Sequence, residues 1–511
     1  MTQAGLVKKS AYQDSVALLA LARDLRTSVG VREVAALMGT PANHDVLRQS
    51  GLLTAEAESA GPNDLVIVVE ADSESLARAA LARAEELLTV TERRLHAAGR
   101  ILPRTIESAH RQLPGANLAL ISVPGAWAAA EARKALRLGL HVMLFSDHVS
   151  VEDEVALKRL ARDKGLLLMG PDCGTAYLSG APLGFANAVP RGRIGLVAAS
   201  GTGLQQVACL LAARGEGISQ AIGVGGRDMS RAVGGLMTLG ALDALGGDAE
   251  TELVIVIGKP PSPEIRRQVE DKLRGFGKPA VVALLGGEVG ASAGEKGVQM
   301  VATLEDAAEA ALATLRHEPW TARPFSGDSA AIHRRIAEAR RTLAPGQRSV
   351  HGLYAGGTLA YEALLLLEPL LGPVSGNLRP EVESVHRIVD LGADEFTLGR
   401  AHPMIDPTSR IDAMAALAKD PRVAVLLLDI VLGHGAAADP AGDLLPALHA
   451  ARERARQDGR PLHVVASVIG TEGDPQGLAA QVANLESAGA WVLPSNAQAA
   501  RAAAAIAQAD P

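Results

Sequence analysis

A glycine-rich loop between an apolar run and a helical pattern is the part of this sequence best suited to chemistry. Residues 195–211 read GLVAASGTGLQQVACLL. The apolar run is typical of a buried strand, and Leu204, Val207 and Leu211 recur at helical spacing. Unpaired N–H groups at a helix start attract anions, and glycine lets a phosphate approach closely. The sequence therefore predicts an anion site formed by Ser200, Gly201, Thr202 and Gly203. An ordinary Ser/Thr helix cap is the alternative.

Strand patterns alternate with helical patterns along most of the chain, which predicts an α/β fold with several parallel-sheet domains. Shifts in these patterns indicate five segments. They are a small N-terminal α/β domain at 1–90, a Rossmann-like domain at 91–180, a module at 185–315, a linker at 316–345 and a second module at 346–511.

The glycine-loop pattern occurs twice, with two further strands following each copy in the same order. The matching pairs of segments are 195–211 with 352–367, 252–264 with 423–440, and 277–290 with 459–474. This order indicates two copies of one module, although chance similarity of Ala/Leu/Gly-rich units is an alternative. Ligands of open parallel sheets bind outside the carboxyl ends of the strands. Two such modules packed face to face would direct helix N-termini at one anion, which favours phosphoryl or acyl-phosphate chemistry.

The repeat places a second glycine loop at the start of its own helix. Gly356, Gly357 and Thr358 occupy the position equivalent to the first loop. They are a second candidate anion site, or only the cap of their helix.

Composition excludes several classes of function. The 511 residues are 48% apolar and carry a net charge of −7, without a basic run or stripe, so a nucleic-acid partner is not expected. The two cysteines, Cys173 and Cys209, lack metal-ligand spacing, which favours a reducing cytoplasm and predicts neither a disulfide nor a metal site. No apolar run reaches the roughly 20 residues of a membrane span, so no membrane partner is expected.

Several motifs carry a family resemblance. The segments NLALISVPG, GPDCG, GLVAASGTG, GVGGRD and KPAVVALLGG resemble the α subunit of succinyl-CoA synthetase, and 345–508 resembles the carboxyl-terminal ligase domain of its β subunit. The motifs MGTPAN, GLYAGGTLA and GRAHPMIDP resemble the FdrA family, across nearly the whole chain. The resemblance implies a degenerate CoA-binding-type Rossmann domain followed by two flavodoxin-like modules.

In succinyl-CoA synthetase a histidine is phosphorylated between two helix N-termini, one from each subunit. The resemblance matches the first N-terminus to Ser200, Gly201 and Thr202, and the second to the loop Gly433-His434-Gly435. It also matches a cysteine beside the thioester site to Cys173, to which we assign no catalytic role because a free cysteine commonly serves as a small buried hydrophobe.

Three departures from that pattern change the expected chemistry. The segment 287–297, where the phosphorylated histidine should lie, contains no histidine. Lys259 stands where the family has the glutamate that holds this histidine, and a lysine suits a bound phosphate or carboxylate. The strand and Gly-rich turn that hold the phosphates of coenzyme A have no counterpart before NLALISVPG, so we do not expect coenzyme A to bind tightly.

The FdrA family is associated with a multisubunit oxamate carbamoyltransferase of allantoin catabolism. The resemblance thus implies a cytoplasmic transferase subunit that converts oxalurate and phosphate to oxamate and carbamoyl phosphate. Its ligands would be phosphate or carbamoyl phosphate and a small carboxylate. Its partners would be other transferase subunits or further copies of itself. An NDP-forming acyl-CoA synthetase with a relocated histidine and a non-catalytic scaffold or regulatory subunit are the alternatives.

Individual side chains complete the predicted site. His434 is the preferred catalytic histidine because it lies in the second matched loop, and Lys259 supplies charge. His402 lies in a loop with Arg400 and Asp406 and is a candidate for acid–base or carboxylate-binding work, or only part of a loop fixed by prolines. Two further residues are candidate substrate ligands with a structural alternative each. They are Arg227, which a surface ion pair would also explain, and Asn43, which turn chemistry would explain.

Overall fold

The chain divides into two compact units. The computed structural model describes residues 2–11, 13, 15–96, 103–287, 297–397 and 401–508. One unit comprises 1–116 with 397–401, and the other comprises 117–396 with 402–511.

The first unit is built on a small antiparallel sheet in the order β1-β3-β2. Strand β3 (Leu65–Ala71) lies between β1 (Thr2–Lys8) and β2 (Val31–Met38), and its residues are almost all buried. Its side chains alternate between two clusters: Leu65, Ile67 and Val69 face one, and Val66 and Val68 face the other. The helices of this unit are α1 (Ser15–Arg26), α2 (Pro41–Gln49), α3 (Ala55–Glu58), α4 (Glu74–His96) and α5 (Ile106–Gln112).

The second unit begins with a parallel sheet of three short strands in the order β4-β5-β6. Helices α6 and α7 connect these strands. The bounds are β4 (Leu118–Ile121), α6 (Gly125–Arg137), β5 (His141–Leu144), α7 (Val151–Asp163) and β6 (Leu168–Met169). The following hairpin of β7 (Thr175–Leu178) and β8 (Ala181–Gly184) pairs with the next sheet, although β7 falls within the segment 91–180 expected to be Rossmann-like.

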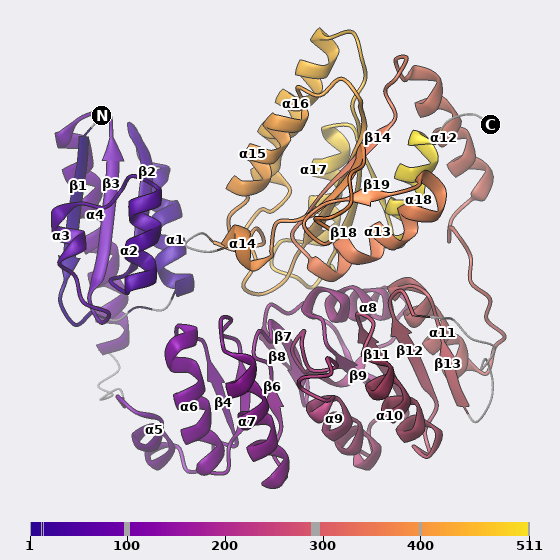
Figure 1. Ribbon diagram of the computed structural model, residues 1–511, viewed down its shortest axis with the longest axis horizontal. Helices are drawn as coiled ribbons and strands as arrows, with labels where there is room; N and C mark the ends of the chain where they lie inside the picture. The colour runs from indigo at the N-terminus through magenta and orange to yellow at the C-terminus, as the bar shows by residue number, and fades with distance from the viewer. Residues whose placement is uncertain are drawn as a thin grey trace. The chain divides into compact units, whose positions relative to one another are not determined.

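The first module is a seven-stranded sheet in the order β13-β12-β11-β9-β10-β7-β8. Its parallel strands are β9 (Arg191–Ala198), β10 (Ile218–Gly223), β11 (Leu253–Gly258), β12 (Ala280–Leu284) and β13 (Val298–Met300). Its helices are α8 (Gly201–Ala213), α9 (Leu236–Gly247), α10 (Pro263–Arg274) and α11 (Leu304–Arg316). Because helices cover both faces of this sheet (Figure 1), β11 reads as the continuous apolar run LVIVIG and is entirely buried.

The second module is a six-stranded sheet in the order β15-β16-β14-β17-β18-β19. Its strands are β14 (Ser349–Tyr354), β15 (Val374–Ser375), β16 (His386–Asp390), β17 (Val423–Val431), β18 (His463–Ile469) and β19 (Ala490–Leu493). Helix α12 (Ser329–Thr342) precedes it. The other helices are α13 (Gly357–Leu371), α14 (Asp394–Thr397), α15 (Thr408–Leu417), a short 3-10 turn (Gly442–Leu444), α16 (Leu445–Gln457), α17 (Leu478–Ser487) and α18 (Asn496–Ala507).

The predicted α/β class is confirmed, and the two modules share one strand order. With the glycine-loop strand numbered first in each, β10-β9-β11-β12-β13 and β16-β14-β17-β18-β19 both read 2-1-3-4-5, which is the flavodoxin-like order. The segments that echo one another in the sequence therefore occupy equivalent strands, β9 with β14, β11 with β17 and β12 with β18.

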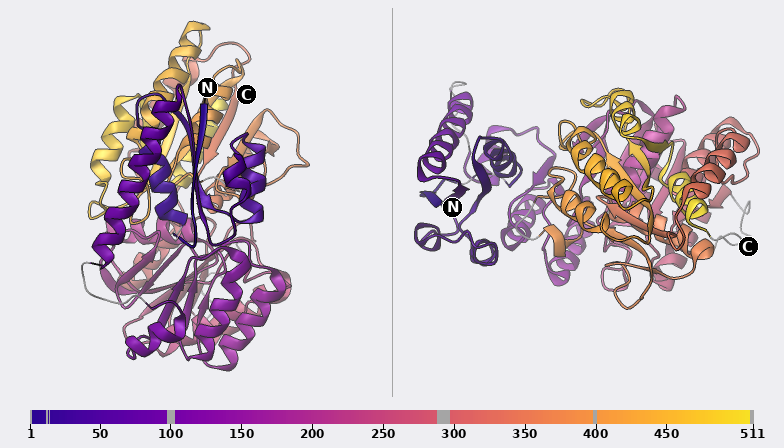
Figure 2. Two further views of the ribbon diagram at one scale, coloured as in Figure 1. Left: turned by 90° about the vertical axis from the view of Figure 1, so that its left-hand side faces the viewer. Right: turned by 90° about the horizontal axis from the view of Figure 1, so that it is seen from above.

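The two modules pack through one helical layer from each. Helices α8 and α11 of the first lie against α13 and α18 of the second. In both views of Figure 2, the second module, coloured orange and yellow, lies beside the magenta first module. One hydrophobic cluster runs through this interface and includes Leu204 and Val207 of α8 and Leu359 and Ala363 of α13. Burial of α8 on nearly every side explains why its sequence is apolar beyond a single stripe.

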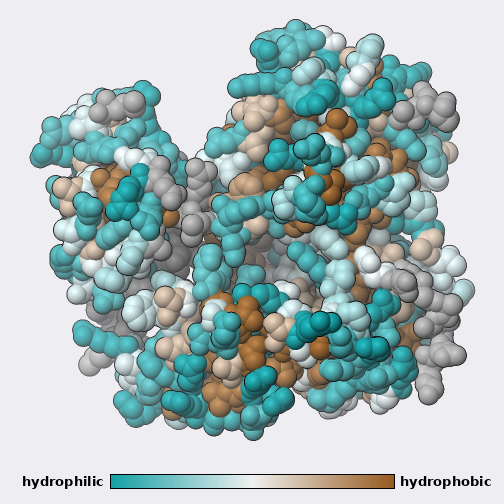
Figure 3. Space-filling model, viewed as in Figure 1, coloured by the Kyte–Doolittle hydropathy of each residue, from teal (hydrophilic) through white to brown (hydrophobic). Residues whose placement is uncertain are grey.

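The surface carries both hydrophilic and hydrophobic patches. The face drawn in Figure 3 is mainly hydrophilic, with apolar residues gathered in smaller areas. Among the described residues, no helix has the length and apolar character needed to cross a bilayer.

Candidate functional site

The N-termini of α8 and α13 meet at the interface of the two modules. Ser200 caps α8, and its Oγ accepts a hydrogen bond of 2.9 Å from the Gly203 N–H. Gly356 caps α13 without a side chain. A Cβ added to Gly356 would lie 2.9 Å from Thr202 Oγ1, so the first turns of the two helices are in direct contact. The two glycine loops identified in the sequence therefore face one another.

Both helix starts retain N–H groups without a protein acceptor. In the described part of the chain, no acceptor contacts the N–H of Gly201 or Thr202 in α8, or of Gly357 or Thr358 in α13. Such groups, together with the positive ends of two helix dipoles, favour a bound anion.

Asp390, at the end of β16, lies beside the first residue of α13. A Cβ added to Gly357 would overlap Asp390 Oδ2. Asp390 Oδ1 accepts a 3.0 Å hydrogen bond from the Gly392 N–H, and Asn377 bonds to the N–H and C=O of Asp390. Only 7% of Asp390 is exposed. Burial raises the pKa of its carboxyl to about 6, although the charge of Lys259 acts in the opposite direction.

Lys259 reaches the same region from the end of β11. Its Nζ lies 5.7 Å from the centroid of the Tyr361 ring, which belongs to the second turn of α13, and its charge acts on Asp390. The lysine is otherwise exposed. A cation at this position supplements the two helix dipoles.

A buried ion pair fixes the loop that precedes α13. Asp429 lies two residues before the end of β17. Its carboxylate accepts hydrogen bonds from the N–H groups of Ala355 and Gly356 at 2.8 and 2.7 Å. Arg410 pairs with Asp429 at 3.3 Å and donates to the Leu353 and Asp429 carbonyls. The Asp429 side chain is fully buried and that of Arg410 nearly so. This pair holds Gly356 in the conformation that starts the helix.

His402 lies next to the same strand ends as a neutral imidazole. Burial lowers its pKa to about 4. Its Nδ1 accepts a hydrogen bond from the Met404 N–H at 3.2 Å, which leaves the proton on Nε2. Nε2 lies against Gly392, where an added Cβ would be 2.6 Å away, and the ring packs on Phe185 with centroids 6.2 Å apart. A small cavity lined by Ala355, Met404 and Arg410 adjoins this region.

The expectation that Gly433-His434-Gly435 forms the second helix N-terminus is wrong. This segment is a loop after β17, and the next helical element of the described chain begins at Gly442. The His434 N–H donates to the Ala186 carbonyl at 2.8 Å, and Gly435 packs on Phe185. The side chain of His434 is exposed. The sequence match failed because Gly433 follows the third strand of its module, whereas the helix that faces α8 follows the first.

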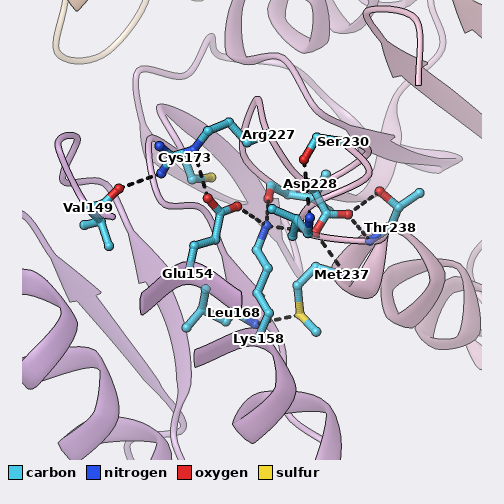
Figure 4. A network of polar contacts seen from close by, with 12 residues as sticks. Val149, Glu154, Lys158, Leu168, Cys173, Arg227, Asp228, Ser230, Met237 and Thr238 are labelled. Carbon is cyan, nitrogen blue, oxygen red and sulfur yellow. Dashed lines mark hydrogen bonds and ion pairs between the residues drawn. The ribbon is translucent and has the colours of Figure 1, made fainter. Parts of the chain in front are cut away.

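Arg227 binds within the protein. Figure 4 shows its guanidinium directed at Glu154, to which Nε donates at 2.9 Å, and Nη2 donates to the Val149 carbonyl at 2.7 Å. On the other side of Glu154, the fully buried Lys158 donates to Glu154 and Asp228 at 2.8 Å each. Asp228 in turn accepts from the Thr238 N–H and hydroxyl at the start of α9. The structural alternative for Arg227, an ion pair, is thus what the structure shows.

Other predicted residues are placed as follows. Asn43 belongs to the first unit, where it lies in the first turn of helix α2 and its side-chain amide donates to the Met38 carbonyl at 2.8 Å. Arg400 and most of the segment 287–297 lie outside the described residues. Cys173 and Cys209 are buried, and burial raises the pKa of the Cys173 thiol to about 12, which excludes a thiolate at neutral pH.

A group of acidic side chains lies in the second unit near these elements. Asp147, His148 and Asp394 bring one ligand atom each to within 4.8 Å of one another, an arrangement suited to a cation. Part of the Asp172 residue is exposed to solvent, but protein atoms surround its carboxyl group. This desolvation raises the pKa of the carboxyl to about 7, and the negative charges of Asp147 and Asp394 raise it further. Sequence reasoning did not identify these groups or Asp390 and Asp429.

Two separate parts of the chain match known protein families. Residues 1–100 match the family "AllF, heavy metal-associated domain", and residues 353–506 match the CoA-ligase family. YahF of Escherichia coli K12 is 41% identical over 503 residues, which cover 96% of each chain. The α subunit of an ADP-forming succinate–CoA ligase from Staphylococcus epidermidis is 28% identical over 188 residues, which cover 36% of this chain and 60% of that subunit.

Solved structures include a dinucleotide-forming acetyl-coenzyme A synthetase from Candidatus Korarchaeum cryptofilum, in complex with phosphate and ADP. It is 17% identical, with a TM-score of 0.32 and coverage of 76% of this chain and 82% of that one. The sequence similarity to YahF extends through both compact units and both modules. The chain therefore belongs to the family of YahF, with an AllF-type domain at its amino end and a CoA-ligase domain at its carboxyl end.

Proposed function

We propose that the N-termini of α8 and α13 bind the phosphate group of an acyl-phosphate-type substrate, and that the chain is a subunit of a carbamoyltransferase. The observation that carries the proposal is the direct contact of two helix starts whose N–H groups meet no acceptor in the described part of the chain. Lys259 places a positive charge beside them. Phosphate is the kind of anion that this arrangement favours.

The reaction implied by the FdrA resemblance needs no further cofactor. A phosphate oxygen attacks the carbamoyl carbon of oxalurate, the bond from that carbon to the internal nitrogen breaks, and the departing oxamate nitrogen takes the proton that the phosphate loses. The products are carbamoyl phosphate and oxamate. Helix N-termini that hold the phosphate would orient it for attack, while Lys259 offsets the negative charge that the phosphate brings into the site. Other transferase subunits, in a cytoplasmic assembly, would supply what this chain lacks.

A second candidate function is an NDP-forming acyl-CoA synthetase, because residues 353–506 match the CoA-ligase family. The sequence of 287–297 contains no histidine to carry a phosphoryl group. Labelling with radioactive ATP, followed by mapping of acid-labile phosphate, separates the two functions. The carbamoyltransferase predicts no phosphohistidine, whereas label on His402 or His434 would support the synthetase.

Calorimetric titration with inorganic phosphate tests the anion site itself. Gly201→Asp puts a carboxylate at the first turn of α8, and we expect it to weaken phosphate binding at least about 10-fold by charge repulsion. Gly247→Asp is the matched control, since Gly247 ends α9 and an added Cβ there meets nothing within 4 Å. Equal phosphate affinity of both variants and the parent would show that Ser200 only caps a helix, and would favour a scaffold.

A further inference from the structure

One group in the proposed anion site has the opposite hydrogen-bonding character to the rest. The N–H groups of Gly201, Thr202, Gly357 and Thr358 and the Lys259 ammonium are all donors. Asp390, the last residue of β16, is an acceptor. It lies beside the start of α13, and only 7% of the residue is exposed to solvent. Its Oδ1 accepts from the Gly392 N–H, but Oδ2 accepts no hydrogen bond from the described part of the chain.

Oδ2 is not one of the enclosed side-chain atoms without a partner in the described chain, so water reaches it in the free protein. A ligand that displaces this water without donating a hydrogen bond leaves the carboxylate desolvated beside a phosphate, which costs free energy. Acetyl or succinyl phosphate presents only C–H groups beside its carbonyl. A carbamoyl group presents an –NH2, whose N–H bonds can satisfy Oδ2 while the phosphate remains on the helix N-termini.

We propose that Asp390 selects substrates whose acyl carbon carries an amino group, by accepting a hydrogen bond from that –NH2 while the two helix N-termini hold the phosphate. This inference rests on the proposed function of the same site. It assigns the site to carbamoyl phosphates rather than to acyl phosphates in general. Asp390 is a specificity-determining residue in this arrangement.

Three anions test the inference on the purified full-length chain. They are inorganic phosphate, carbamoyl phosphate and acetyl phosphate, and the last two differ only by –NH2 against –CH3. Because a hydrogen bond to a charged group contributes about 1.5–3 kcal/mol, the parent protein should bind carbamoyl phosphate roughly 10- to 100-fold more tightly than acetyl phosphate in calorimetric titrations.

Asp390→Asn should reduce this preference to about 3-fold or less, because a neutral amide is a weaker acceptor than a carboxylate. Inorganic phosphate should bind as well as before or more tightly, since a negative charge has been removed. Asp458→Asn is the matched control, because Asp458 pairs with Arg454 at the partly exposed end of α16. It should keep the preference of the parent.

The pH dependence of the parent provides a test that does not depend on the folding of a variant. Protonation turns the Asp390 carboxylate into a neutral acid, which is a weaker acceptor, so the preference measured at pH 8 should fall at pH 5. The charged groups that act on Asp390 are Lys259, Asp429, Glu395 and Asp172. They affect both ligands alike, and the phosphate groups of the two ligands titrate in the same range, so the ratio of affinities isolates the –NH2 contact.

The outcomes separate the two proposals. If none of the three anions binds, the proposed function fails. If inorganic phosphate binds but the parent does not distinguish carbamoyl from acetyl phosphate, only the role of Asp390 is overturned. A preference that survives Asp390→Asn and is equal at pH 5 and pH 8 would also overturn it.

Discussion

At the scale of single residues, the site depends on carboxylates at strand ends. Asp390 ends β16 and Asp429 lies near the end of β17. The sequence motif that could have identified Asp390 is VDLG, an acidic residue after an apolar strand and before a glycine, at the edge where ligands of parallel sheets bind. Asp429 could not have been identified, because it is buried within the apolar run VLLLDIVL and acts only through Arg410 and the loop 355–356.

The buried Arg410–Asp429 pair should be essential for the fold of the second module. Asp429→Ala leaves the Arg410 guanidinium uncompensated and removes the acceptor of the Ala355 and Gly356 N–H groups. We expect a loss of about 3–5 kcal/mol of stability, measured as the free energy of unfolding in urea. Asp420→Ala, which breaks the exposed pair with Arg422, should cost about 1 kcal/mol or less. Similar small losses in both variants would contradict the structural role of the pair.

His402 should make the protein less stable in acid. Because burial lowers its folded-state pKa to about 4, below its usual value of 6.5, its contribution to stability is complete above pH 6.5 and is lost as the pH falls toward 4. Asp390 has a raised pKa and contributes in the opposite direction, so the comparison must be between variants. The melting temperature of His402→Phe should fall less between pH 7 and pH 4.5 than that of the parent. Parallel curves would show that the imidazole takes up a proton as readily in the fold as in the unfolded chain.

At the scale of elements, the order of the strands could be predicted and the pairing of the helix starts only in part. The three pairs of matching segments predict that β9, β11 and β12 are equivalent to β14, β17 and β18, because each module repeats an apolar run, a glycine loop and a helix. The strand orders of the two sheets agree with this equivalence. The repeat also gives Gly356-Gly357-Thr358 the position in the second module that Ser200-Gly201-Thr202 has in the first. The motif match chose Gly433-His434-Gly435 instead, because local sequence does not show that α13, rather than the loop after β17, packs against α8.

The contact between the two helix starts predicts coupling between Gly356 and Thr202. Gly356→Ala places a Cβ 2.9 Å from Thr202 Oγ1 and 3.0 Å from Thr202 Cβ, so one helix start must move. Thr202→Gly removes both atoms. In a double-mutant cycle, the destabilisation caused by Gly356→Ala should be smaller by about 0.5–3 kcal/mol in the Thr202→Gly background. Simple additivity of the two unfolding free energies would indicate that the helix starts are not in contact.

At the scale of the whole molecule, similarity over 96% of YahF shows that both compact units belong to one family architecture. The first unit matches a domain described as heavy metal-associated, yet neither of the two cysteines of the chain lies within residues 1–100. Thiolate ligation of a soft metal therefore has no basis in this unit. Sequence reasoning predicted a small α/β domain here, but the antiparallel pairing of β1 with β3 could not be read from the weakly apolar segment 2–8.

The reduced sheet that opens the second unit predicts that coenzyme A does not bind tightly. Its three strands have the order β4-β5-β6, and no strand of the described chain pairs with the free edge of β4. Leu120 of β4 is 49% exposed and Trp127 of α6 is 57% exposed. Dinucleotide-type phosphates are held by the Gly-rich turn after the first strand of such a sheet, and that strand and turn are missing from the sequence before Asn117.

Calorimetric titration of the full-length chain should give a dissociation constant for coenzyme A weaker than about 1 mM. Inorganic phosphate, which we propose the α8 and α13 N-termini bind independently of this sheet, serves as the positive control in the same preparation. Micromolar affinity for coenzyme A would mean that the three-stranded sheet retains a nucleotide site, and would shift the balance from carbamoyl transfer to acyl-CoA synthesis.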